Sequence, residues 1–178
     1  ELPSTIIDLT GEKFQILRQG SIKEEDILKV LEDWDMKIAI GCDHAGLKAK
    51  NELINFLKGN HYEVIDFGTY TDESCDYPVF GKAVGNAVKN KEADFGVVIC
   101  STGEGIMMSV NKIPGIRCGL GYTDDASRLM REHNNAQVIS FGANLMDVED
   151  IKRRTLIFLN TPFSNGERHI RRIDLIEK

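Results

Sequence analysis

The feature that most constrains the fold is a regular alternation of short apolar runs and amphipathic segments, beginning at Met36. The apolar runs cover residues 37–42, 63–67, 95–100, 116–120 and 138–141. Segments with helical spacing of apolar residues lie between or after them, at 47–58, 79–89, 106–111, 124–133 and 148–159. Nearly continuous apolar strands separated by helices are typical of a parallel sheet covered on both faces. The sequence therefore predicts a three-layer α/β/α, doubly wound (Rossmann-like) fold around a mainly parallel five-stranded sheet.

Residues 1–35 lie outside this alternation. They contain candidate strands at 4–9 and 14–18 and a candidate helix at 24–31, too little to bury a core alone. Met36 looks like a translation start, so we expect an N-terminal extension over 1–35 and a complete domain over 36–178. The extension resembles the closing segment of the threonylcarbamoyl-adenylate synthase domain, which implies a non-catalytic remnant. The alternative is a family-specific extension that packs on the surface.

Composition excludes several classes of partner and cofactor. The net charge of −6 disfavours nucleic acid or an anionic membrane surface as the main partner. No apolar stretch has the length that a membrane span needs, and no signal-peptide layout is present. The four cysteines are widely spaced, without a CxxC pair, as in proteins of the reducing cytoplasm. The histidines do not accompany them at ligand spacing, so no metal is expected.

One apolar run ends at Cys100 and is followed by the turn Ser101-Thr102-Gly103-Glu104-Gly105. Open α/β folds bind their ligands at the carboxyl ends of strands, and free N–H groups at a helix start attract anions. Such donors also lower the pKa of a neighbouring thiol. The turn therefore indicates a site for proton or acyl chemistry, the alternative being that Cys100 is a small core residue.

Asp43 and His44 follow the first strand of the domain. In a doubly wound sheet the first and third strands are neighbours, so these side chains are expected to converge with Cys100 and Thr102. The alternatives are a helix N-cap for Asp43 and a solvent-facing loop position for His44.

Two further segments carry candidate site residues. His133 and Asn134 close the helix predicted at 124–133, where a histidine also complements the helix dipole. Tyr77 precedes the helix predicted at 79–89 and is a candidate wall of a pocket; the alternative is simple turn chemistry from Asp76 and Pro78.

The C-terminal stretch is basic within an acidic protein. Arg168 and Arg172 are four residues apart and share a face if the stretch is helical, an arrangement that suits a phosphate group. The alternative is a solvated charged face. Because Ile170, Ile173 and Ile176 make another face apolar, we expect a helical arm that packs on a partner subunit.

These motifs occur in one order along the chain: 41–44, 76–78, 100–103, 111–112, 115–117, 131–136 and 166–169. In that order they resemble ribose-5-phosphate isomerase type B, a family whose relatives include galactose-6-phosphate isomerase subunits and allose-6-phosphate isomerases. The resemblance runs from Met36 to the C-terminus. It implies interconversion of ribose 5-phosphate and ribulose 5-phosphate through a cis-enediolate, in the pentose phosphate pathway, without metal or cofactor. It also implies a homodimer or a tetramer.

The resemblance assigns catalytic roles to Cys100, Thr102, His133 and Asp43. It assigns substrate binding to His44, Tyr77, Ser101, Gly103, Gly105, Asn134, Arg168 and Arg172. Cys100 would be the base that moves the proton between C2 and C1, and Asp43 and His133 would open the sugar ring. Arg168 and Arg172 would reach the phosphate of the neighbouring subunit.

The chain departs from the family pattern at three positions. Ser101 stands where glycine is common, Glu104 places a carboxylate in the anion-binding turn, and Asn144 stands where many members carry a phosphate-binding arginine. The last departure leaves a hexose 6-phosphate open as the substrate. A non-catalytic sugar-phosphate-binding module is a further alternative, although such a module has no need of the Cys100 thiol.

Overall fold

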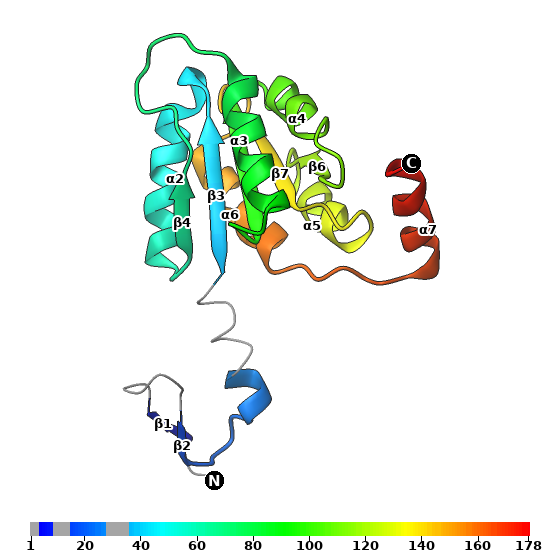
Figure 1. Ribbon diagram of the computed structural model, residues 1–178. Coiled ribbons are helices and arrows are strands. Elements are labelled where there is room, and N and C mark those ends of the chain that lie inside the picture. Colours follow the sequence, from blue (N-terminus) through cyan, green and yellow to red (C-terminus); the bar gives the residue numbers. More distant parts are fainter. Residues whose placement is uncertain (1–3, 9–14, 28–35) are drawn as a thin grey trace. The chain divides into compact units, whose positions relative to one another are not determined.

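The computed structural model describes residues 4–8, 15–27 and 36–178 (Figure 1). The chain divides into two compact units, Glu1–Met36 and Lys37–Lys178. In the first unit β1 (Ile6–Asp8) pairs antiparallel with β2 (Gln15–Arg18), and residues 24–27 are helical. The remainder of the helix predicted at 24–31 lies outside the described residues.

The second unit is a three-layer α/β/α structure (Figure 1). Its strands are β3 (Lys37–Cys42), β4 (Glu63–Asp66), β5 (Phe95–Cys100), β6 (Cys118–Leu120) and β7 (Val138–Gly142). Its helices are η1 (His44–Gly46), α2 (Leu47–Gly59), α3 (Tyr77–Lys89), α4 (Glu104–Val110), α5 (Asp124–Glu132), α6 (Val148–Leu159) and α7 (Glu167–Ile176). The five strands are all parallel, in the order β4-β3-β5-β7-β6. Helices α3 and α4 cover one face of the sheet, while α2, α5 and α6 cover the other. The predicted fold is confirmed.

The strands are apolar on both faces because helices cover both. Residues 38–40 of β3 and 97–99 of β5 are fully buried. Two helices begin earlier than predicted, for local reasons. Pro78 lies in the first turn of α3, where its fixed φ suits a helix start. Gly103 caps α4 with a left-handed conformation, so the helix begins at Glu104 rather than at Ile106.

The strand register defines two opposite edges of the sheet. Cys42 pairs with Ile99 next to Cys100, which itself pairs with Gly142, so β3, β5 and β7 end together at what we call the carboxyl edge. The strands begin at the amino edge, which includes Phe95. The predicted neighbourhood of β3 and β5 is therefore confirmed. Among the described residues, no helix combines the length and apolar character that crossing a membrane requires.

Candidate active site

Cys100 is the last residue of β5 and is buried at the carboxyl edge. Its Sγ accepts a hydrogen bond of 3.1 Å from the backbone N–H of Gly103. A polar N–H group interacts more strongly with a thiolate than with a neutral thiol. Gly103 reaches this position with φ of 84°, and a Cβ there would lie 2.6 Å from Leu120 Cδ1 and 2.8 Å from the carbonyl carbon of Phe141. Only glycine fits the turn that directs the N–H at the sulfur.

The other buried thiols are unsuited to proton transfer near neutral pH. Burial raises the pKa of Cys42 to about 12, although Lys50 opposes the shift, and burial also raises the pKa of Cys118. Such thiols stay protonated and cannot act as bases. Cys42 shares with Cys100 the strand-end position and an amide donor, the Thr69 N–H, so its raised pKa is what excludes it as a base.

Asp43 and His44 lie beside Cys100 at the carboxyl edge, where the Asp43 N–H donates to the carbonyl of Ile99. Asp43 Oδ1 accepts from the Gly46 N–H at 3.1 Å, so this carboxylate also caps η1, as the alternative interpretation expected. His44 Nδ1 accepts from the Cys75 N–H at 3.3 Å. The neutral ring therefore carries its proton on Nε2, where it is a donor for an anion.

Tyr77 forms a wall of the turn after β5. It is the first residue of α3, and a Cβ on Gly105 would lie 2.6 Å from Tyr77 Cζ. The phenol ring therefore lies directly on the backbone of Gly105. The role of Tyr77 as a lining residue of the sugar pocket stays a prediction.

Ser101, Glu104 and Asn144, the three positions singled out in the sequence, lie around the same turn. Asn144 Nδ2 donates to Ser101 Oγ at 2.8 Å, so two of these residues contact each other. Glu104 is exposed and lines, with Thr102, Asn144 and Arg154 among others, a pocket of about 520 Å³ that Cys100 does not line. Glu104 therefore shares this pocket with Thr102.

His133 and Asn134 lie at the amino edge, away from Cys100 of the same chain. The guanidinium of Arg131, in the last turn of α5, lies 4.7 Å from the ring centroid of Phe95. Phe95 and Cys100 are the two ends of β5, which at the usual strand rise lie about 17 Å apart. The structure therefore brings Asp43, His44, Tyr77 and the 100–105 turn together, but not His133 and Asn134 with them within one chain.

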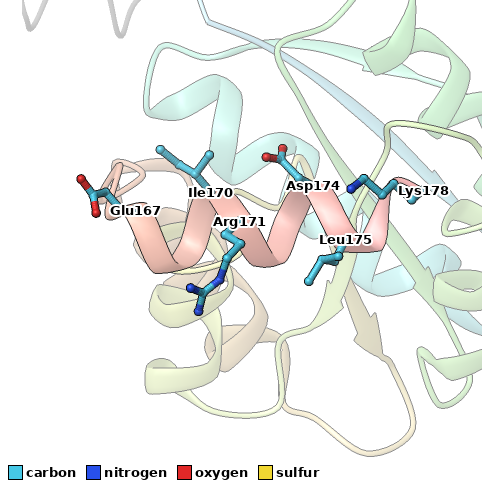
Figure 2. Close-up of a pocket in the computed structure, with 6 residues that line it drawn as sticks. All are labelled: Glu167, Ile170, Arg171, Asp174, Leu175 and Lys178. Atoms are coloured by element: carbon cyan, nitrogen blue, oxygen red, sulfur yellow. The ribbon is translucent and has the colours of Figure 1, made fainter.

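The predicted C-terminal arm is α7, which follows an extended segment and lies to the side of α5 and β6 (Figure 1). Ser164 N–H donates to the Glu132 carbonyl at 3.0 Å, and the Gly115 N–H donates to Glu177 Oε2 at 3.0 Å. The helix carries Arg168 and Arg172, both exposed. One side of it is a shallow pocket of about 310 Å³ (Figure 2). We call this surface the arm face: Glu167, Ile170, Arg171, Asp174, Leu175 and Lys178.

Sequence reasoning missed an ion pair between a buried lysine and a partly exposed aspartate behind the site. Lys50 is fully buried, and its Nζ lies 2.7 and 2.8 Å from the two carboxylate oxygens of Asp66. Asp66 Oδ1 also accepts from the Gly68 N–H, and the Gly68 carbonyl accepts from the Cys42 N–H. The ion pair is therefore connected, through Gly68 in the loop after β4, to Cys42, the residue before Asp43. The available signal was a lysine on the apolar side of the helix predicted at 47–58.

Within the part of the chain that the structure describes, no three His, Cys, Asp or Glu side chains are grouped as a metal site requires. The sequence analysis also missed the contact of Cys75 with His44 and that of His169 with His133. The spacing of these residues along the chain does not indicate either contact.

Comparison with known proteins places this geometry in a family. Residues 38–176 match the family model described as Ribose/Galactose Isomerase. The chain is 37% identical over 142 residues to ribose-5-phosphate isomerase B of Mycobacterium tuberculosis, which covers 79% of this chain and 88% of that protein. It is 39% identical over 146 residues to galactose-6-phosphate isomerase subunit LacB of Clostridium acetobutylicum, covering 80% and 84%.

A solved structure agrees with these sequence matches. Ribose-5-phosphate isomerase B of Clostridium thermocellum superposes with a TM-score of 0.78 at 44% identity, over 80% of this chain and 95% of that one. The chain belongs to the ribose/galactose isomerase family.

Proposed function

We propose that the protein interconverts ribose 5-phosphate and ribulose 5-phosphate through a cis-enediolate, as an enzyme of the pentose phosphate pathway. The observation that carries this proposal is Cys100 at the carboxyl edge with the Gly103 N–H directed at its sulfur. Family membership and relatives named ribose-5-phosphate isomerase B support it.

The difficult step is removal of the weakly acidic C2 proton of the open-chain aldose. In the proposed mechanism the Cys100 thiolate takes this proton and returns it to C1, so that no net proton is consumed. Thr102 Oγ1 and N–H groups of the 101–105 turn stabilise the enediolate oxygen, aided by Asn134. The proposed mechanism uses no metal and no cofactor.

The substrate enters largely as a furanose, which must open first. We assign ring opening to Asp43, buried beside β5, and to His133 as its acid–base partner. The donor Nε2–H of His44 then faces the phosphate, and Arg168 and Arg172 hold it from the other side.

This assignment needs two copies of the chain. Cys100 and Asp43 lie at the carboxyl edge, whereas His133, Arg168 and Arg172 lie at the amino edge or on α7. A two-fold dimer resolves the separation if the amino-edge residues of one copy complete the carboxyl-edge site of the other. The arm face supports this, because Leu175 is 63% exposed and Ile170 42% exposed. We propose a homodimer, with a tetramer as the alternative.

A coupled assay on ribose, allose and galactose phosphates tests the function. We expect the highest kcat/KM with ribose 5-phosphate. Preference for a hexose 6-phosphate would instead support the second candidate, which the 39% identical LacB relative and the uncharged Asn144 favour. Binding without turnover of any of the three would identify a sugar-phosphate-binding module and contradict the proposal.

We also propose that residues 1–35 take no part in catalysis. The family match begins at residue 38, and the second compact unit begins at Lys37. A variant that starts at Met36 should therefore keep kcat and KM within about twofold of the values for the full chain. Surface changes far from a functional site usually have effects of this small size. The coupled assay measures both constants. An inactive or insoluble product would show that the extension supports the enzyme.

The four cysteines are all free thiols. We therefore propose the reducing cytoplasm as the place where the enzyme acts.

A further inference from the structure

Two histidines lie ring against ring where α5 ends and α7 begins. The ring centroids of His133 and His169 are 4.3 Å apart, with an interplanar angle of 47°. The His169 residue is only 6% exposed, whereas the His133 side chain is 36% exposed. His169 is thus the inner ring of the pair, and His133 is the one that a ligand can reach.

The hydrogen bonds of His169 fix its protonation state. Arg168 Nε lies 3.0 Å from His169 Nε2, and a guanidinium N–H can only donate, so Nε2 is an unprotonated acceptor. Nδ1 lies 2.9 Å from Ser164 Oγ and carries the proton of the neutral ring, which it donates to that hydroxyl. His169 is therefore a neutral imidazole with the proton on Nδ1.

The surroundings disfavour a second cation at this position. Burial is the largest cause that lowers the pKa of His169, and the nearby His133, Arg168 and Arg172 lower it further. Glu132 acts in the opposite direction and lies 3.8 Å from His133 Nε2. His169 thus stays neutral at pH values where an exposed histidine already takes up a proton.

We propose that His169 is a positioning residue of the isomerase site: its neutral ring supports His133, and its Nε2 orients the guanidinium of Arg168. One buried ring thereby holds the ring-opening histidine and a phosphate-binding arginine in a fixed relation. This inference rests on the proposed function. Protonation of His169 would remove the acceptor for Arg168 and add a cation between His133 and the two arginines. The positions of His133 and Arg168 should therefore no longer be held as the pH falls through the pKa of His169.

Nuclear magnetic resonance of the four histidine rings in the full-length protein tests the structural part, whether or not the protein is an isomerase. In ¹⁵N-labelled protein titrated from about pH 8 to about pH 5, spanning the ordinary histidine range, His169 should be the Nδ1–H tautomer. It should titrate below the ordinary value, and its pKa should rise in His133→Gln. His61→Asn, a change in the turn after α2, serves as the control. A His169 with the proton on Nε2, or with an ordinary pKa, overturns the proposal.

Kinetics test the positioning part. His169→Phe keeps a flat ring against His133 but offers Arg168 no acceptor, so KM for the sugar phosphate should rise about 3- to 10-fold, the range of one lost hydrogen bond, with a smaller change in kcat. His169→Gln keeps an acceptor but removes the ring that contacts His133, so KM should stay near the wild-type value while kcat falls.

In the wild-type protein, protonation of His169 should contribute to the fall of kcat/KM on the acid side of the pH profile. That contribution should be absent in His169→Gln. A merely structural role predicts that both variants lose kcat and thermal stability alike without separating KM from kcat, and that result overturns the proposal. If wild-type protein shows no isomerase activity at all, the proposed function fails and the positioning role falls with it. The tautomer and pKa of His169 remain measurable in that case.

Discussion

Replacing Cys100 by alanine should lower the kcat of isomerisation by about 10²–10⁴-fold, which is the usual contribution of a positioned general base. The reason is that the thiol at the end of β5 has an amide donor directed at its sulfur and lies beside Asp43 and the 101–105 turn. Binding of the sugar phosphate should remain measurable by calorimetry, because His44 and the arginines are unchanged.

Cys118→Ala is the matched control. It also removes a buried thiol, but one whose raised pKa keeps it protonated and which lies in β6. It should cost some stability and leave kcat close to the wild-type value. Turnover that survives in Cys100→Ala, or that falls equally in the control, would assign the proton transfer to a different group.

Mixing two inactive variants should restore activity. If the site combines Cys100 of one copy with His133 of the other, Cys100→Ala and His133→Ala chains form hybrids with one doubly altered site and one intact site. After denaturation and joint refolding in equal amounts, half of the two-fold dimers are hybrids, so about a quarter of wild-type activity should return. The coupled assay measures the recovery, and each variant refolded alone is the control.

Failure to recover activity, with hybrids demonstrated by mass spectrometry, would place both groups in the site of a single chain. High activity in His133→Ala alone would remove this histidine from the mechanism. The experiment therefore separates the arrangement of the site from the identity of its base.

The sequence predicted the fold because its physical signals are local. Runs such as 95–100 are apolar throughout, as strands buried on both faces must be, and turn residues mark the helix starts. The neighbourhood of Asp43 and Cys100 followed from a general rule about strand ends. The position of His133 also follows from topology, because the helix after a strand runs back to the edge where that strand began.

Other parts of the site depend on distances that no pattern encodes. The contact of Asn144 with Ser101 joins residues 43 positions apart, a separation that no local pattern reveals. Lys50 and Asp66 come from a helix and a strand whose relative placement only packing determines. The contact between the tilted rings of His169 and His133 likewise arises where α7 meets the end of α5.

The most direct test of the account is deuterium exchange during isomerisation in heavy water, followed by NMR of the sugar. With wild-type protein, ribose 5-phosphate should acquire deuterium at C2 and ribulose 5-phosphate at C1, because an enediolate passes its proton through a base that exchanges with solvent. With Cys100→Ala, ribose 5-phosphate should still bind, but its C2 position should stay unlabelled. Exchange at C2 that continues at the wild-type rate without the thiol would contradict the central claim that Cys100 carries the proton.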